Sequence, residues 1–362
     1  MSEVTQSGHP TLGRLPQNRL RSTPGHLGAQ QAMMRREFIT LIGGVASWPL
    51  VARAQNSTKI FRIAVFPDFI PQVAVWFSAE MSSHGWIEGR DLIIEQFGSK
   101  LSDLQLDEAA PRVVASKPDL IVTISTAHAL ALQRATRSIP IVMLSSGYPI
   151  EAGVADSLSK PGRNVTGNAL YAATGVWGKM LQLIRDAKPN IERVGVLWTY
   201  VVPAFPKEEI DPCFAELEKG ARSFGLKLHI VEVSNSNPLQ AALANIESGK
   251  PDGLVLTSLF APDALSIVTQ FAVHKGLPTI IDFDWAPYGV SPLPLMSYGP
   301  VFRGLVLRAA AATNQILRGS KPGDIPIQNP DRFEMVVNLK TARAIDLSLP
   351  ESFLLRADKV TD

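Results

Sequence analysis

From Lys59 onward, short apolar runs alternate with longer stretches in which apolar residues recur every three or four positions. Runs such as Leu120–Val122 and Leu254–Leu256 are continuously apolar, which is typical of parallel strands covered on both faces. The longer stretches have the period of amphipathic helices. The alternation predicts repeated β-α-β units, and therefore an α/β fold built from doubly wound parallel sheets.

The pattern places these elements at definite positions. In the first half we expect strands at 60–66, 91–97, 119–124 and 140–145, with helices at about 71–84, 103–116 and 127–137. In the second half we expect strands at 192–198, 227–233, 253–257 and 278–282, with helices at about 208–224, 238–248 and 263–275. A helix at 301–317, a strand at 333–337 and a short helix at 340–345 complete the chain.

The two halves resemble each other in sequence. KPDLIVTISTAHAL, from Lys117 to Leu130, is echoed by KPDGLVLTSLFAPDAL, from Lys250 to Leu265. The echo extends upstream, where 62–66 matches 193–197 and 92–95 resembles 229–232. This period is too long for a solenoid repeat and fits a duplicated domain. Two similar α/β lobes that face each other enclose a cleft.

Two glycine-bearing segments, 162–167 and 295–299, predict where the chain crosses between the lobes. We therefore expect lobe 1 to comprise 59–166 and 297–330, and lobe 2 to comprise 167–296 and 331–362. More than one crossing makes a hinge of several strands, which permits closure without separation of the domains.

Residues 1–54 are predicted to lie outside this fold. A polar, disordered extension precedes the twin arginines Arg35 and Arg36, an apolar run at 38–50 and the small-residue site that ends at Ala54. These features predict an export signal of the twin-arginine type, cleaved after Ala54, and a periplasmic location. The alternative of a buried helix or membrane anchor is disfavoured because the apolar run is short and rich in glycine.

Composition excludes several classes of function. The formal charge of +2 belongs largely to the leader and indicates no nucleic-acid surface. The single cysteine, Cys213, permits neither a disulfide framework nor a cysteine metal cluster. No HExxH, GxSxG, Walker or dinucleotide fingerprint is present, so we expect no enzyme, no cofactor and no metal. His128 lacks a nucleophile partner, and a surface position is favoured for it.

In open parallel sheets, ligands bind at the carboxyl ends of the strands. Ser125 and Thr126 open a helix there, which suits a ligand carboxylate; the alternative is plain N-capping. The candidates in lobe 1 are Asp68, Phe69, Ser125, Thr126, Ser145, Ser146 and Tyr148.

Lobe 2 presents acids and aromatic rings at the equivalent places. Asp282 and Asp284 are natural partners for a ligand ammonium group, and turn formation or helix capping is the alternative. The candidates are Thr199, Tyr200, Ser258, Phe260, Asp282, Asp284 and, at the second crossing, Tyr298. Hydroxyls on one side with acids and aromatics on the other predict a zwitterionic ligand with an apolar side chain.

Four segments resemble one family: the leader from Arg35, PGRNVTG at 161–167, LMSYG at 295–299, and the tail from Phe333 to Val360. They are similar to the periplasmic substrate-binding proteins of ABC transporters related to the tryptophan/tyrosine-binding type. The resemblance implies a type I periplasmic binding fold with two Rossmann-like lobes and a three-strand hinge. It also implies delivery of a small solute to an ABC permease.

The chain departs from this family in the predicted pocket. Pro67-Asp68-Phe69 stands where small polar residues are usual, Tyr148-Pro149 where Asp-Pro is usual, and Thr199-Tyr200 where Asn-Pro is common. The resemblance therefore does not name the ligand. We expect a monomeric, exported receptor for an ABC importer. The alternatives are a ligand sensor for a membrane kinase or chemoreceptor, and a two-domain α/β enzyme such as a transferase.

Overall fold

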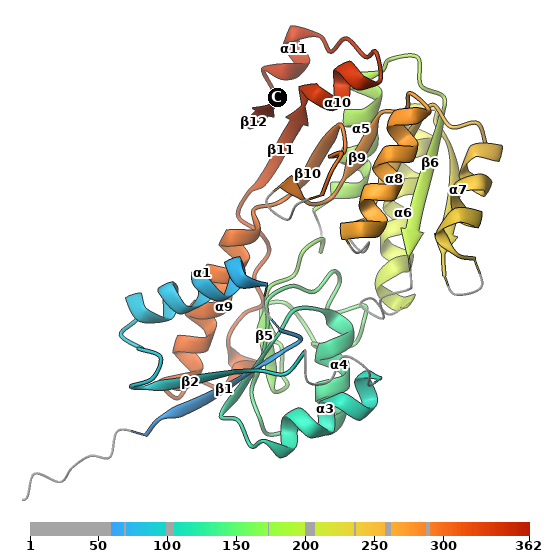
Figure 1. The fold of residues 1–362 in the computed structure, drawn as a ribbon. Helices are drawn as coiled ribbons and strands as arrows, with labels where there is room; N and C mark the ends of the chain where they lie inside the picture. Colours follow the sequence, from blue (N-terminus) through green and yellow to red (C-terminus); the bar gives the residue numbers. More distant parts are fainter. Residues whose placement is uncertain are drawn as a thin grey trace, which may run out of the picture. The chain divides into compact units, whose positions relative to one another are not determined.

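The computed structural model describes residues 59–362 except 69, 99–104, 173, 200–206, 235–236, 258–261 and 287–289. The export signal predicted within 1–54 lies outside these residues. The described residues form two β-sheets with helices packed against them, which we call lobe 1 and lobe 2 (Figure 1). No described helix combines the length and the hydrophobicity that crossing a bilayer requires.

Lobe 1 is built on a five-stranded parallel sheet with the order β2-β1-β3-β4-β5. Its strands are β1 (Phe61–Phe66), β2 (Leu92–Gln96), β3 (Leu120–Thr123), β4 (Ile141–Met143) and β5 (Val165–Gly167). Its helices are α1 (Pro71–Ser83), α3 (Leu106–Ala115), α4 (Thr126–Ala135) and α9 (Phe302–Leu317).

Alternation along β1 divides the core of lobe 1 into two layers. Ile63 and Val65 pack with residues of α1 and α9 on one face of the sheet. Ala64 and Phe66 pack with residues of α3 and α4 on the other face. Both faces are apolar because helices cover both, as the continuous apolar strands predicted.

Lobe 2 is built on a seven-stranded sheet with the order β12-β11-β10-β9-β8-β6-β7. Its strands are β6 (Arg193–Thr199), β7 (Lys227–Val233), β8 (Gly253–Leu256), β9 (Thr279–Ile281), β10 (Met296–Pro300), β11 (Phe333–Asn338) and β12 (Lys359–Thr361). Its helices are α5 (Val176–Ala187), α6 (Lys207–Phe224), α7 (Leu239–Ser248), α8 (Pro262–His274), α10 (Leu339–Ala344) and α11 (Glu351–Leu354). Only the β10–β11 pair in this sheet of described strands is antiparallel.

The strand orders bear out the duplication predicted from the sequence. β7-β6-β8-β9-β10 repeats the order and the parallel direction of β2-β1-β3-β4-β5. Even the backbone of the repeated KPD segment is duplicated: Lys117 has φ 53° and Lys250 has φ 47°, both in the left-handed region that non-glycine residues rarely adopt.

The aspartate of each KPD segment makes the same hydrogen bonds. Asp119 Oδ2 accepts from the Arg62 amide at 2.8 Å, and Asp252 Oδ2 accepts from the Arg193 amide at 2.8 Å. In both lobes the aspartate thus fixes the start of the first strand against the start of the third. The repeated motif is structural, and functional differences between the lobes lie elsewhere.

Two of the longer elements, α5 and β10, differ from those expected. The sequence predicted no helix at α5, although its apolar residues repeat at helical spacing. Gly175 directly precedes α5 and Gly178 lies within it, and glycine disfavours helix. Tyr298 was placed at the return to lobe 1, yet Met296–Pro300 pairs with β9 and β11 in lobe 2. Its Gly-Pro end resembles a turn, but Pro300 sits at the strand terminus, where proline is tolerated.

Three segments that run between the two sheets are hydrogen-bonded to one another. Asn168 pairs with Gln328 in a parallel bridge, and its Nδ2 donates to the Leu305 carbonyl at 2.9 Å. The Val301 amide donates to the Arg332 carbonyl at 3.2 Å. The hinge therefore consists of joined segments, as the resemblance implied.

Candidate functional site

The helix that follows β3 begins without a side-chain cap. Ser125 is the N-cap residue of α4, with φ −129° and ψ 164°, but its hydroxyl caps no helix amide. Ser125 Oγ instead lies 2.6 Å from His128 Nδ1. Thr126 Oγ1 lies 2.7 Å from Ser146 Oγ, which follows β4. The plain N-capping alternative is therefore wrong, and hydroxyls from two strand ends lie beside an uncapped helix terminus.

His128 does not have the surface position that the sequence favoured. Its ring packs edge-on against Phe66 with the centroids 5.0 Å apart, and it is half-buried. Burial lowers the pKa of His128 from 6.5 to about 4, because desolvation disfavours the imidazolium. At neutral pH the ring is uncharged, so it adds no positive charge to this region.

Two further candidates in lobe 1 are half-buried and partly reachable from solvent. Asp68, after β1, accepts a hydrogen bond from the Gly98 amide, which joins the loops that follow β1 and β2. Ser145 donates to the carbonyl of Ile124 and so joins the ends of β3 and β4.

A pair of tyrosines connects lobe 1 to lobe 2 through the hinge. Tyr148, after β4, lies with its ring centroid 6.0 Å from that of Tyr171, in the first crossing segment. The Tyr148 hydroxyl donates to Glu216 Oε1 on α6 at 3.2 Å. The Tyr171 hydroxyl donates to the carboxylate of Asp282, which follows β9 and is 2% exposed. The loop after β4 and the loop after β9 are thus linked by one hinge residue.

Burial sets the protonation of Tyr148. It raises the pKa of Tyr148 far above the usual range, and the nearby Cys213 and Glu216 add to the shift. Burial also raises the pKa of Glu216, against the hydrogen bond from Tyr148, which lowers it. The Tyr148 hydroxyl therefore remains a donor at any physiological pH.

Tyr171 and Glu216 were not predicted from the sequence. Tyr171 follows the PGRNVTG segment by four positions, so an aromatic residue directly after a predicted crossing was the available signal. Glu216 lies inside α6 and carried no signal, because an acidic residue in a helix is usually exposed.

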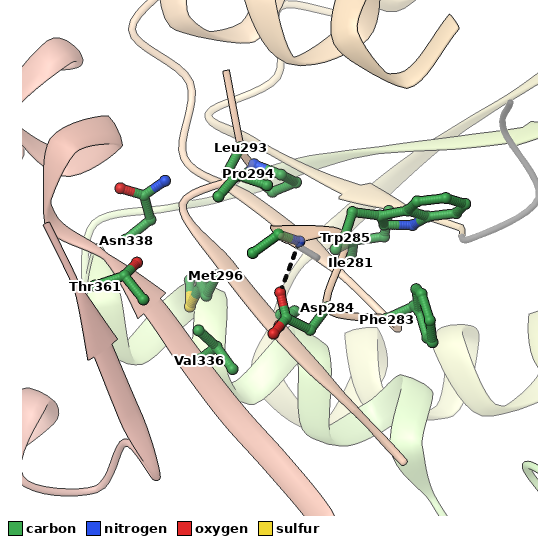
Figure 2. Close-up of a pocket in the computed structure, with 12 residues that line it drawn as sticks. Ile281, Phe283, Asp284, Trp285, Leu293, Pro294, Met296, Val336, Asn338 and Thr361 are labelled. Carbon is green, nitrogen blue, oxygen red and sulfur yellow. Dashed lines mark hydrogen bonds between the residues drawn. The ribbon is translucent and has the colours of Figure 1, made fainter. Parts of the chain in front are cut away.

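The loop after β9 carries an ordered acid between aromatic rings. Figure 2 shows Asp284 with its Oδ1 accepting from the Ala286 amide at 3.0 Å. Phe283 and Trp285 lie with their ring centroids 5.3 Å apart in an edge-to-face arrangement. The cavity drawn there has a volume of about 20 Å³, which suits a water molecule and is too small for an amino acid.

The remaining candidates of lobe 2 do not belong to the loop after β9. Tyr298 stacks on Phe333 with the centroids 5.7 Å apart, on the face of β10 opposite Ser297, which lines the cavity of Figure 2. Thr199 is buried at the end of β6. Phe69, Tyr200, Ser258 and Phe260 lie outside the described residues.

Exposure divides the described candidates into two groups. Five are at most 3% exposed and can act only by positioning the loops, unless those loops move: Thr126, Ser146, Tyr148, Thr199 and Asp282. Ser125, at 9%, lies just beyond them. Four are half-buried and reachable: Asp68, Ser145, Asp284 and Tyr298. Within the ranges described, no His, Cys, Asp and Glu side chains group as metal ligands.

The two sheets and their hinge define a type I periplasmic binding fold. A conserved domain protein of Vibrio cholerae O1 biovar El Tor has a similar structure, with a TM-score of 0.71 at 24% identity, covering 84% of this chain and 100% of that one. An ABC domain from Streptococcus pneumonia in complex with L-Trp also has a TM-score of 0.71, at 22% identity, covering 83% and 100%. At these identities the likeness concerns the fold alone.

The family follows from the sequence. The model of the ABC transporter substrate binding protein family matches residues 83–361, and the chain belongs to this family. A tyrosine-binding protein of Clostridioides difficile is 29% identical over 300 residues, which are 82% of this chain and 82% of that protein. Membership identifies a binding protein rather than an enzyme, as the sequence predicted, with a small-molecule substrate and a transporter as its partners.

Proposed function

We propose that this protein is an exported receptor that captures a small amino acid, or a related carboxylate with an apolar part, and delivers it to an ABC importer. The observation that carries the proposal is the uncapped start of α4 at Ser125, a terminus positioned by the buried hydroxyl pair of Thr126 and Ser146. Helix amides and hydroxyls are donors, and the helix dipole favours a negative charge at this end. A ligand carboxylate is the group that this end of lobe 1 suits best.

Lobe 2 supplies groups of opposite character. The loop after β9 carries the carboxyl groups of Asp282 and Asp284, and we assign the ligand ammonium group to this loop. Asp284 is half-buried and has no ion-pair partner among the described residues, so a positively charged group would complement it. The neighbouring rings of Phe283 and Trp285 suit the apolar part of the solute.

Two relatives support an amino acid as the ligand. One is named a tyrosine-binding protein, and the structure from Streptococcus pneumonia contains L-Trp. This chain departs from the usual residues of the family it resembles at Pro67-Asp68, Tyr148-Pro149 and Thr199, which follow strands of the two lobes. We therefore assign the class of ligand and leave the side chain to experiment.

The mechanism is a population shift. Donors of lobe 1 and acids of lobe 2 reach the solute together in only one arrangement of the lobes. The solute binds that arrangement more tightly than the others and so shifts the population toward it. The leader at 35–54 supports export by the twin-arginine route and cleavage after Ala54, and the permease would then meet the loaded, monomeric receptor outside the cytoplasm.

Isothermal titration calorimetry of the exported protein tests this proposal. The panel comprises L-tyrosine, L-tryptophan, L-leucine, the matching amines and the matching carboxylic acids without an amino group. We expect one or more amino acids to bind and both truncated series to bind at least tenfold more weakly. Equal binding of an amino acid and its amine would refute the carboxylate role of α4, and no heat from any amino acid would refute the ligand class.

A further inference from the structure

A second cavity lies beside the hinge, next to the one in Figure 2. It has a volume of about 190 Å³ and shares Phe283, Asp284, Ser297 and Val336 with its small neighbour. Its remaining lining comes from α1, the end of β10, the start of α9 and β11. On the scale on which about 10–15 Å³ admits one water molecule, the space is large enough for a small organic molecule.

Three aromatic rings line this cavity: Trp76 on α1, Phe283 after β9 and Phe302 at the start of α9. Phe283 and Phe302 stand at 85° to each other with their centroids 5.3 Å apart, so they form two adjoining walls. Aromatic rings present negative faces and attract cations, above all quaternary ammonium groups that water solvates weakly.

The charges on the lining also favour a cation. Asp284 and Glu334 are acidic, and Arg303 is the one basic side chain among the described lining residues. Glu334 already pairs with Arg332 at 3.3 Å. Asp284 has no such partner in the described part of the chain, although it is half-buried and held in place through Ala286. A half-buried carboxylate without a counter-charge gains most from a cationic ligand.

We propose that this cavity is a binding site for a small organic cation, with the quaternary ammonium or alkylammonium group held by Trp76, Phe283, Phe302 and Asp284. No residue of the hydroxyl group on lobe 1 lines it, so the site does not require the carboxylate of the proposed solute. The site overlaps the proposed function only at Asp284 and in the loop that carries it. Because its lining joins α1 of lobe 1 to β10 and β11 of lobe 2, an occupant contacts both lobes.

Choline and its neutral carbon isostere 3,3-dimethylbutan-1-ol form the matched pair of probes, titrated into the full protein at constant ionic strength. We expect choline to bind saturably and the isostere to bind at least tenfold more weakly, since only the charge differs. Equal affinities would show that the cavity binds only the apolar part of the probe and would contradict a cation site. The absence of saturable heat from choline would overturn the proposal.

Variants locate the site. Trp76→Leu and Asp284→Asn should each weaken choline at least tenfold, whereas Val75→Ala, on the same helix and 61% exposed, should leave it unchanged. If Trp76→Leu and Asp284→Asn both bound choline as the wild type does, the choline site would lie elsewhere. If either variant fails to fold, a nuclear Overhauser contact between the choline methyl protons and the Trp76 indole in the unmodified protein takes its place, and its absence overturns the proposal. Trp76→Leu should not affect amino-acid binding. Ser125→Ala should weaken amino-acid binding and should not affect choline, because Ser125 does not line this cavity. The failure of this site and the failure of the proposed function are therefore distinguishable.

Discussion

Replacing Tyr171 by phenylalanine tests the link that joins the hinge to the loop after β9. The substitution removes only the hydroxyl that donates to the Asp282 carboxylate. Asp282 is 2% exposed, so water cannot readily replace the lost donor. Hydrogen bonds to charged groups contribute about 1.5–3 kcal/mol when one partner is removed from a buried pair. We therefore expect the free energy of unfolding to fall by about 2 kcal/mol and Tm by about 3 °C for a protein of this size.

Urea denaturation followed by circular dichroism measures this change. Tyr298→Phe is the matched control, because Tyr298 is half-buried on β10, the strand that pairs with β9, and its hydroxyl has no hydrogen bond to any described residue. We expect the control to change stability by less than about 0.5 kcal/mol. Combining Tyr171→Phe with Asp282→Asn should show a coupling of about 1 kcal/mol or more. If Tyr171→Phe lowered the free energy of unfolding no more than Tyr298→Phe did, the link between the hydroxyl and the carboxylate would not stabilise the hinge.

Three further predictions concern the repeated motif and the buried histidine. Lys250→Gly should raise the free energy of unfolding by about 0.5–1 kcal/mol, because glycine relieves the left-handed backbone there, and a loss of stability in urea denaturation would contradict this. Burial acts to raise the pKa of Asp252, but the Arg193 and Glu192 amides together with the charges of Arg193 and Lys188 outweigh it, and the pKa is lowered. Asp252→Asn should therefore destabilise at pH 7, and the difference should disappear as the pH falls below the ordinary value of 3.8 and through the lowered pKa, whereas a pH-independent difference would refute the reasoning. His128 binds its proton less readily when folded, so the wild type should lose about 2–3 kcal/mol between pH 6.5 and pH 4, while His128→Gln should give a nearly flat profile in the same titration.

Most of the fold could be predicted because burial leaves a regular signal. Apolar runs located nine of the strands within a few residues, and the KPD repeat indicated two lobes of the same strand order. The sequence did not reveal β5, β12 or α11, because elements of three or four residues bury too little surface to create a period. β10 was not predicted because its Gly-Pro end has the local propensity of a turn, whereas the segment pairs as a strand in the sheet.

The candidate site was less predictable, for a physical reason. Strand ends predict which residues come near the carboxyl edge of a sheet, and they placed Thr126 beside Ser146 in this way. They do not predict which side chains turn inward: His128 packs on Phe66, and Tyr148 reaches Glu216 on the other lobe. Such contacts depend on residues far apart in the sequence, and no local pattern encodes them.

Native mass spectrometry of the exported protein tests the central claim most directly. Protein purified without denaturation from the periplasm of producing cells is measured intact and after the removal of bound molecules. We predict a mature mass that begins at Gln55, with one additional molecule per chain that is released on denaturation and fragments as an amino acid or a related carboxylate. Protein that carries no small molecule and acquires none from a mixture of amino acids would contradict the account.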